Sequence, residues 1–411
     1  MNANRLNILL CCTLVLIFSA IGCGGVGASS PKPTPTPTPG SSPTPSPTPS
    51  PTPAPATSAA FVYVANNGST QNVGGSIAGF RVNPGDGSLA PVPGSPFKAG
   101  NGPSAIGSDP QGRFVFVGED GSVPGARGNN CALAPSILLL TERVDPASGT
   151  LTQTDQKTVT GNCIRAISVD PTGSNVYVGV GDPSGAGGQI HGFLLGPSGT
   201  LTELPGSPVQ VDDIALSLAT HPSGKFLYAA TPNLTVLDRD PASGILKVRG
   251  VFNTAKRALA LNPAGNLLVA SEAGSNEVSE FHIDGDGNVL AVDQRVQASD
   301  PFGVAADPQG QFFAITEITD TTNFNGGLSL LKFNSVNGEY TKVNSTPFGS
   351  GGAPLDLAFE PTGKFVYEVF HNDGTVGGFA LDRNANTLTA IPAKPFASGD
   401  NPVSLTIVQP R

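Results

Sequence analysis

Short hydrophobic runs separated by polar turns fill the chain from residue 60 onward, which predicts a succession of β-strands. Many of these runs flank the same turn phrase, an acidic or polar residue followed by Pro, any residue and Gly. Pro presets φ and Gly supplies a positive φ, so the phrase predicts a tight turn between two strands. It occurs at Asp109–Gly112, Asp170–Gly173, His221–Gly224, Asn262–Gly265, Asp307–Gly310 and Glu360–Gly363, with a partial copy at Gln409–Pro410. Its prolines stand 61, 51, 41, 45, 53 and 49 residues apart, and a period near fifty residues is typical of a repeat architecture.

Each repeat resolves into four strand-like runs, which in the second repeat are 104–108, 113–117, 136–144 and 151–159. The two ends of the repeat array are incomplete in complementary ways. Phe61–Val64 is typical of a second strand, and Ser404–Val408 is typical of a first strand. Together they make up one blade, which closes a ring and hides the sheet edges. We therefore predict an all-β fold for residues 60–411, a seven-bladed β-propeller with four antiparallel strands per blade.

The loops of such a ring alternate between its two faces. The Pro-Gly turns and the turns between third and fourth strands share one face, and their similarity indicates a scaffold. The loops between second and third strands and the crossovers between blades share the other face. They vary in length and composition, as loops that carry function tend to do. We expect this variable face to carry a binding site near the ring axis, with Arg165, Glu317 and His371 as binding residues.

The first 59 residues are predicted to lie outside the ring. Residues 1–22 have the pattern of a signal peptide, because Arg5 precedes an apolar run that is short for a membrane span. The sequence Ala20–Gly24 resembles a bacterial lipobox, which implies a lipidated Cys23 and a lipoprotein of the cell envelope anchored in the outer membrane. The alternative is an ordinary secretory signal cleaved nearby, and both imply export. Residues 23–59 are predicted to be a linker in which Pro31–Pro55 forms a polyproline II spacer of roughly 75 Å.

Two cysteines fall within the predicted ring. Cys131 lies in the longest loop and Cys163 in the crossover that follows, so both belong to the variable face around one blade. In an exported protein this placement favours a Cys131–Cys163 disulfide, with two unpaired thiols as the alternative.

Composition limits the partners. A net charge of −9 without a basic cluster argues against nucleic acid, whose phosphates need clustered Lys and Arg. The four histidines share no ligand spacing, so we predict no metal site, although acidic loops leave calcium binding open. We expect no cofactor. We expect a monomer that contacts the membrane only through its lipid anchor and binds a small anionic or lactone ligand or an envelope component.

Two stretches of the chain resemble a known family. The sequences of Phe61–Asn67 and Gly75–Val82 are similar to the YVTN repeats of surface-layer propellers and to lactonase-type seven-bladed propellers, which include phosphogluconolactonase and muconate-cyclising branches. The resemblance spans Ala60 to Arg411 and implies the propeller fold. In the catalytic branches an Arg binds carboxylate or phosphate and a Glu lies in the same axial funnel. The resemblance places Arg257 and Glu272 at these two catalytic positions.

The catalytic set of that family is incomplete in this sequence. The His beside the family's Arg is Ala258 here, the preceding crossover Asp213–Leu216 has no His, and Ser299–Gly303 has no second Arg. Lactone opening needs a general acid or base as well as oxyanion stabilisation. We therefore interpret the chain as a surface-tethered binding or structural module of the envelope. The alternative is a lactone hydrolase of the 6-phosphogluconolactonase type, with Arg257 as anion clamp and Glu272 as base or water-positioning group.

Overall fold

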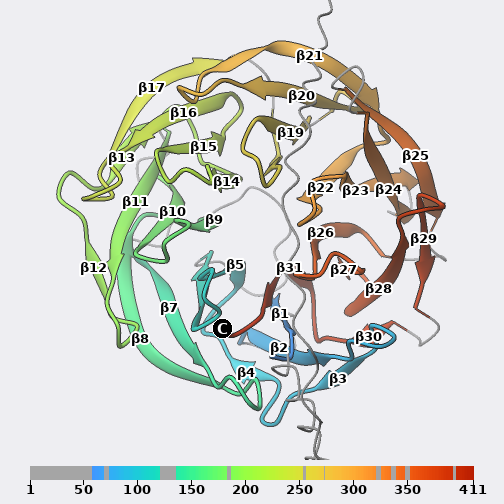
Figure 1. Ribbon diagram of the computed structural model, residues 1–411. Coiled ribbons are helices and arrows are strands. Elements are labelled where there is room, and N and C mark those ends of the chain that lie inside the picture. Colours follow the sequence, from blue (N-terminus) through green and yellow to red (C-terminus); the bar gives the residue numbers. More distant parts are fainter. Residues whose placement is uncertain are drawn as a thin grey trace, which may run out of the picture. The chain divides into compact units, whose positions relative to one another are not determined.

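A computed structural model of the protein describes residues 58–68, 74–120, 136–182, 187–252, 256–272, 274–320, 325–334, 339–347, 352–391 and 395–411. These residues form β-strands and turns, and none of their segments is a helix long and apolar enough to cross a membrane. The strands make seven separate antiparallel sheets arranged as the blades of one ring (Figure 1). The predicted seven-bladed β-propeller is confirmed.

Blades 1 to 3 each run from an innermost strand outward. Blade 1 consists of β31 (Pro402–Val408), β1 (Phe61–Asn66), β2 (Ser76–Val82) and β3 (Leu89–Pro91), with β4 (Phe97–Lys98) also paired to β2. Blade 2 consists of β5 (Pro103–Ser108), β6 (Phe114–Glu119), β7 (Ser136–Val144) and β8 (Leu151–Thr160). Blade 3 consists of β9 (Ile164–Val169), β10 (Asn175–Gly181), β11 (Gly188–Leu195) and β12 (Leu201–Glu203), with β13 (Val209–Val211) also paired to β11.

The remaining four blades follow the same order. Blade 4 consists of β14 (Ser217–Thr220), β15 (Phe226–Ala230), β16 (Leu234–Arg239) and β17 (Leu246–Phe252). Blade 5 consists of β18 (Ala258–Leu261), β19 (Leu267–Ser271), β20 (Glu277–Ile283) and β21 (Val289–Gln297). Blade 6 consists of β22 (Pro301–Ala306), β23 (Phe312–Asp320), β24 (Asn325–Asn334) and β25 (Glu339–Pro347). Blade 7 consists of β26 (Pro354–Phe359), β27 (Phe365–Phe370), β28 (Thr375–Asp382) and β29 (Thr387–Ala390), with β30 (Phe396–Ala397) also paired to β28.

The ring closes through strands from opposite ends of the described chain. β1 pairs antiparallel with β31, with Phe61 opposite Val408 and Val64 opposite Leu405. The expectation that the N- and C-terminal strands share one blade is therefore confirmed. Closure of this kind removes the inner sheet edge that blade 1 would otherwise expose.

The Pro-Gly turns hold the inner two strands of a blade together. In the first of them, Gly112 has φ of +71°, and a Cβ at that position would lie 2.7 Å from the carbonyl oxygen of Gln409. Asp109, the first residue of the turn, accepts hydrogen bonds from the backbone N–H groups of Arg113 (2.6 Å) and Phe114 (2.8 Å). The turn thus satisfies its own backbone while packing against the neighbouring blade.

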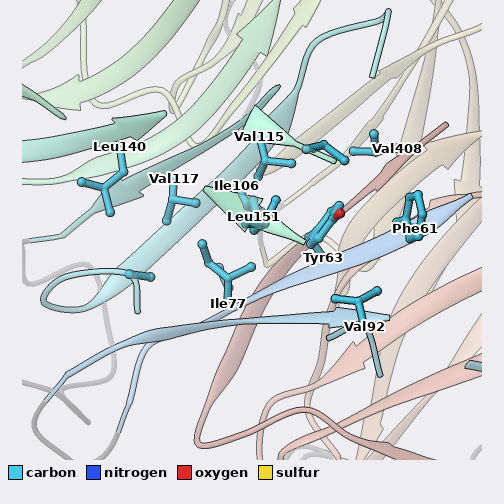
Figure 2. Close-up of a cluster of buried hydrophobic side chains, with 13 residues drawn as sticks. Phe61, Tyr63, Ile77, Val92, Ile106, Val115, Val117, Leu140, Leu151 and Val408 are labelled. Atoms are coloured by element: carbon cyan, nitrogen blue, oxygen red, sulfur yellow. The ribbon is translucent and has the colours of Figure 1, made fainter. Parts of the chain in front are cut away.

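The core consists of seven hydrophobic clusters, one in each seam between neighbouring blades. Alternation along the strands explains this arrangement, because successive side chains point to opposite faces of a sheet. In β1, Phe61 and Tyr63 pack against blade 2 (Figure 2), whereas Val62 and Val64 pack against blade 7. All four side chains are fully buried, so both faces of every blade are needed to hold the ring together.

Candidate functional site

A cavity of about 820 Å³ occupies the axis of the ring. The innermost strands of the seven blades, β5, β9, β14, β18, β22, β26 and β31, surround it (Figure 1). Residues that follow β1, β6 and β27 also line it, namely Asn67, Asp120 and His371. These are the starts of loops on the predicted variable face, whereas Pro110, Pro361 and Gln409 of the Pro-Gly turns line a smaller pocket elsewhere.

Seven equivalent residues, which we call the rim ring, line this cavity. Each stands five residues before the first residue of a Pro-Gly turn, so each occupies the same place near the start of an inner strand. The rim ring consists of Ser104, Arg165, Leu216, Arg257, Phe302, Leu355 and Ser404. The repeat therefore supplies seven matching positions, and the sequence places positive charge at two of them, in blades 3 and 5.

Arg257 is held in place by blade 6. Its Nη1 donates hydrogen bonds to Asp300 Oδ1 (3.2 Å) and to the carbonyl oxygen of Pro301 (3.3 Å). Its guanidinium lies over the ring of Phe302, with Cζ 3.6 Å from the ring centroid. Among the described residues these hydrogen bonds engage only Nη1, and the side chain is 25% exposed. The remaining N–H groups of the fork are available to a ligand, and a planar fork suits a carboxylate or phosphate.

Asp300 has an unusual backbone conformation that serves this contact. Its φ is +36°, in the left-handed region that residues with a side chain rarely adopt. Two further non-glycine residues with positive φ, Ala353 (φ 35°) and Asn401 (φ 54°), line the cavity. Such conformations cost of order 1–3 kcal/mol each and cluster at ligand-binding sites.

Arg165 is the second cation of the rim ring. Burial lowers the pKa of Arg165, and the carboxylate of Asp120 opposes that shift. Asp120 in turn accepts a hydrogen bond from Asn67 Nδ2 (3.3 Å). Because a guanidinium is not deprotonated in proteins, Arg165 is a cation of the cavity, with Asp120 as a nearby counter-charge from blade 2.

His371 contributes an imidazole to the same cavity. Its Nδ1 lies 3.0 Å from the carbonyl oxygen of Pro402. Because a carbonyl oxygen can only accept, Nδ1 carries the proton, and Nε2 is the basic nitrogen of the neutral ring. The sequence named His371 as a binding residue, and the structure places it with Arg165 and Arg257.

Asp356 is a site residue that the sequence analysis missed. It lines the cavity one position after the rim ring, where other blades carry Ala, Ser, Gly or Leu. Burial raises the pKa of Asp356, although hydrogen bonds from Ser404 Oγ (2.7 Å) and the N–H of Leu405 (3.0 Å) oppose this shift. Its only signal in the sequence was an acidic residue at a position that is otherwise small or apolar.

Glu272 does not line the cavity. It is buried beside Lys256, whose Nζ lies 2.5 Å from Glu272 Oε1, and Ser279 Oγ also donates to Oε1. Burial alone raises the pKa of Glu272, but the bonds from Lys256 and Ser279 outweigh it and lower the pKa overall. The expectation that Glu272 shares one funnel with Arg257 is therefore not met. The charged partners of Glu272 are Lys256 and Arg295, whose Nη1 lies 3.4 Å from Oε2.

Glu317 has the same kind of environment in blade 6. It accepts a hydrogen bond from Ser329 Oγ (2.6 Å), and Lys342 Nζ lies 2.7 Å from its Oε1. The side chain is buried and is not part of the cavity lining. Glu317 therefore serves the interior of its blade and not the binding site that the sequence analysis assigned to it.

A difference of one position along the second strand separates the residues that line the cavity from the buried glutamates that do not. Glu119, Glu272 and Glu317 lie ten residues after the first residue of their Pro-Gly turn. Asp120, Ile318 and His371 lie eleven residues after it. Of these six residues, only the three that lie eleven residues after the turn line the cavity, because neighbouring side chains in a strand point to opposite faces. Counting from the turn would have identified Asp120 as well as His371.

Of the three cysteines with predicted roles, only Cys163 lies among the described residues. Cys163 is fully buried just before β9. Cys131 and Cys23 lie outside the described residues. The Cys131–Cys163 disulfide and the lipidation of Cys23 stay predictions. Within the described ranges no group of three or more His, Cys, Asp or Glu side chains is placed to hold a metal ion.

The comparisons with known proteins agree with this architecture. The family model described as "Lactonase, 7-bladed beta-propeller" matches residues 195–306. A 6-phosphogluconolactonase of Serratia proteamaculans is 26% identical over 211 residues, which are 49% of this chain and 61% of that protein. The chain is a seven-bladed β-propeller that is similar in sequence to the lactonase-type family.

Solved structures show the same fold at low sequence identity. A Bacteroides fragilis protein, provisionally named a 6-phosphogluconolactonase, is 19% identical with a TM-score of 0.68, over 87% of this chain and 100% of that one. The periplasmic gluconolactonase of Pseudomonas aeruginosa is 19% identical with a TM-score of 0.66, over 85% and 99% of the two chains. At this identity the likeness concerns the fold of the propeller and not its activity.

Proposed function

We propose that this propeller is a lactone hydrolase whose substrate binds in the axial cavity. The observation that carries the proposal is the meeting of Arg165, Arg257 and His371 around one cavity of about 820 Å³. That volume is typical of small-molecule sites. The names of the relatives from Serratia proteamaculans and Pseudomonas aeruginosa support the same reaction class. The comparisons lend no such support to an envelope binding module.

The proposed reaction adds water to the lactone carbonyl. Nε2 of His371 takes a proton from water as the water oxygen bonds to the carbonyl carbon. The negative charge that develops on the carbonyl oxygen is stabilised by the N–H groups of Arg257 that Asp300 and Pro301 leave available. The ring C–O bond then breaks, and the leaving oxygen takes the proton from His371. The product is a hydroxy acid, which releases its carboxyl proton to solvent, and the resulting carboxylate is held by Arg257 and Arg165.

Glu272 has a different part in this proposal from the one that the family resemblance gave it. Its lowered pKa and its bonds to Lys256 and Ser279 make it a poor general base. Lys256 immediately precedes Arg257, so the buried pair holds the backbone that carries the anion clamp. Glu272 is therefore a positioning residue.

The test is hydrolysis of a panel of γ- and δ-lactones, including 6-phosphogluconolactone, by the purified full-length protein. We expect Arg257→Ala to lower kcat/KM by about 10²–10³ and His371→Gln to lower kcat by about 10²–10⁴. Arg249→Ala is the matched control, because Arg249 is an arginine of the outer strand β17 paired with Asp238 (2.6 Å). No turnover of any lactone, or turnover that Arg257→Ala and His371→Gln leave intact, would refute the proposal.

We also propose that Cys23 carries lipid and tethers the ring to the outer membrane. The lipobox-like sequence at Ala20–Gly24 and the Pro-rich stretch that follows it support this. Metabolic labelling with a radioactive fatty acid should mark the protein, and Cys23→Ser should abolish the label. A label that survives Cys23→Ser, or a wild-type protein without label, contradicts the anchor.

We further propose the Cys131–Cys163 disulfide. The complete burial of Cys163 supports it, because an oxidised pair would be shielded from solvent reductant on that side. Mass spectrometry after alkylation without reductant should leave both cysteines unmodified, and prior reduction under denaturing conditions should expose both. Alkylation of either thiol in the unreduced, unfolded protein contradicts the pairing.

A further inference from the structure

The wall of the axial cavity changes character below the rim ring. In five successive blades, 2 to 6, the residue two positions after the rim residue is aliphatic and lines the cavity; these residues are Ile106, Ile167, Leu218, Leu259 and Val304. None of these side chains can form a hydrogen bond. A ligand that extends from the two arginines along the axis therefore meets a hydrocarbon surface.

The position between the rim residue and the aliphatic residue, one residue after the rim, adds little polarity to the cavity wall. Of its residues in the lining, only Ser217 and Asp356 have polar side chains. Ser217 Oγ accepts a hydrogen bond from the N–H of Leu259 (3.2 Å). Asp356 accepts from Ser404 Oγ and Leu405 N–H at Oδ2, and from Leu357 N–H (2.9 Å) at Oδ1. Both groups are thus engaged in bonds to the protein's own inner strands.

We infer that the substrate is an amphiphilic lactone, whose reactive end lies at Arg165 and Arg257 and whose aliphatic substituent occupies the wall below them. This inference rests on the proposed hydrolase function for the identity of the reactive end. A polyhydroxylated lactone is a poor match for this wall, because hydroxyl groups placed against it lose their bonds to water without replacement. Each methylene group placed there gains about three- to fourfold in affinity.

The rim ring suits the same orientation. Its two charges stand in blades 3 and 5, and the residue between them in blade 4 is Leu216. Phe302 and Leu355 continue the apolar part of the rim ring in blades 6 and 7. Anionic and oxyanion groups therefore bind at blades 3 and 5, while an alkyl chain has apolar rim neighbours at Leu216 between the two arginines and at Phe302 and Leu355 beyond Arg257.

The first experiment measures turnover against chain length in the full-length protein. The substrates are γ-butyrolactone, γ-hexalactone, γ-octalactone and γ-decalactone, with glucono-δ-lactone for comparison. We expect kcat/KM to rise about three- to fourfold per added methylene group until the cavity is filled, and glucono-δ-lactone to be the poorest substrate. A flat series, or preference for glucono-δ-lactone, overturns the inference.

The second experiment needs no turnover, so it separates this inference from the proposed function. Isothermal titration calorimetry compares octanoate and decanoate with gluconate. We expect decanoate to bind more tightly than octanoate and gluconate to bind most weakly, and Ile167→Asn to weaken decanoate about tenfold or more. Ile407→Asn is the matched control, because Ile407 is also a half-buried isoleucine of an inner strand but lines the smaller pocket.

The two experiments together distinguish failure of the amphiphilic-ligand inference from failure of the hydrolase proposal. Decanoate binding that depends on Ile167 but not on Ile407, without turnover of any lactone, upholds the amphiphilic ligand and refutes the hydrolase. Lactone turnover with equal binding of gluconate and decanoate upholds the hydrolase and refutes the aliphatic wall as a specificity element. Equal losses from Ile167→Asn and Ile407→Asn attribute the effect to the stability of the ring and also overturn the inference.

Discussion

Lys256 and Glu272 form an ion pair in the interior of the propeller, with Lys256 Nζ 2.5 Å from Glu272 Oε1 and the lysine side chain fully buried. The ammonium also lies 4.8 Å from the centroid of the Phe281 ring. Burial lowers the pKa of Lys256, and the bond to Glu272 opposes that shift. Removal of Glu272 alone leaves the buried ammonium of Lys256 without this counter-charge.

We therefore predict that Glu272→Ala lowers the free energy of unfolding by about 3–5 kcal/mol. Chemical denaturation at neutral pH measures the loss. The double variant Lys256→Met, Glu272→Leu is the control, because it removes both charges and should recover most of the stability. A double variant as unstable as Glu272→Ala would contradict the account of an uncompensated charge.

A repeated tyrosine links neighbouring blades. The hydroxyl groups of Tyr63, Tyr177, Tyr228 and Tyr367 donate to the carbonyl oxygens of Gly149 (2.6 Å), Gly244 (2.7 Å), Gly287 (3.0 Å) and Gly87 (2.7 Å), each in the outer turn of the next blade. All four tyrosines are fully buried, and burial raises the pKa of Tyr177 to about 12.

Each Tyr→Phe change at these positions is expected to destabilise the ring by about 1–3 kcal/mol, because it leaves a buried carbonyl without its donor. Thermal unfolding of the four single variants gives the measurement. Phe116 occupies the equivalent place in blade 2, so Phe116→Leu serves as a packing control without a hydrogen bond. Four Tyr→Phe variants as stable as the parent protein would show that these bonds contribute nothing.

The fold could be predicted from the sequence because its main signal is repeated. The turn phrase recurs in full in six blades and in part in the seventh, and the unmatched strands at Phe61–Val64 and Ser404–Val408 require a closed ring. Each copy confirms the others, so an irregular loop in one blade does not hide the pattern. The placement of Arg165 and Arg257 also followed, since both stand at the same distance from a Pro-Gly turn.

The acidic residues of the site could not be assigned in the same way. Glu272 and Asp120 are both acidic residues next to the end of a second strand, and a shift of one residue decides which face each side chain takes. Lys256 and Lys342 are distant enough in sequence from Glu272 and Glu317 that only the folded ring shows the pairing. Asp356 had no counterpart in the other blades and so carried no repeated signal.

Asp356 also ties the last inner strand to blade 7. Through Ser404 and Leu405 it holds β31, the strand that completes blade 1. We predict that Asp356→Ala lowers the free energy of unfolding by about 2–4 kcal/mol, since it leaves the hydroxyl of Ser404 and the N–H of Leu405 without their acceptor, at about 1–3 kcal/mol each. Ser404→Ala should cost less, because the bond from Leu405 N–H remains. Hydrogen exchange should show the larger loss of protection in β31, and a loss spread evenly over all blades would contradict a local role.

Stability should depend on pH through two buried carboxyl groups of different blades. Burial raises the pKa of Glu142 from 4.5 to about 7, and burial also raises the pKa of Glu368 well above its usual value. Glu368 is fully buried, and among the described residues neither of its carboxyl oxygens has a hydrogen-bond partner. Equivalent positions in blades 2 and 6 carry Val117 and Ile315, so Glu368 stands where the other blades have hydrocarbon.

A carboxyl group with a raised pKa in the folded state holds its proton more tightly there than in the unfolded chain. Its contribution to stability is present below the unfolded pKa and is lost as pH rises through the folded pKa, here from about 4.5 to about 7 for Glu142. A shift of that size corresponds to about 3 kcal/mol. Below this window the lowered pKa of Glu272 acts in the opposite direction, and stability falls as the pair with Lys256 loses its carboxylate.

We therefore predict maximal stability at mildly acidic pH, with a falling thermal midpoint between pH 5 and pH 8. Glu142→Gln should flatten this slope, because the amide does not titrate. Glu368→Leu should stabilise the protein at pH 8, since it replaces an unpartnered carboxylate by a side chain like those at the equivalent positions. The measurement is thermal unfolding at each pH for the parent and both variants. A parent protein that gains stability from pH 5 to pH 8 would mean that these two carboxyl groups find partners or water in the folded state.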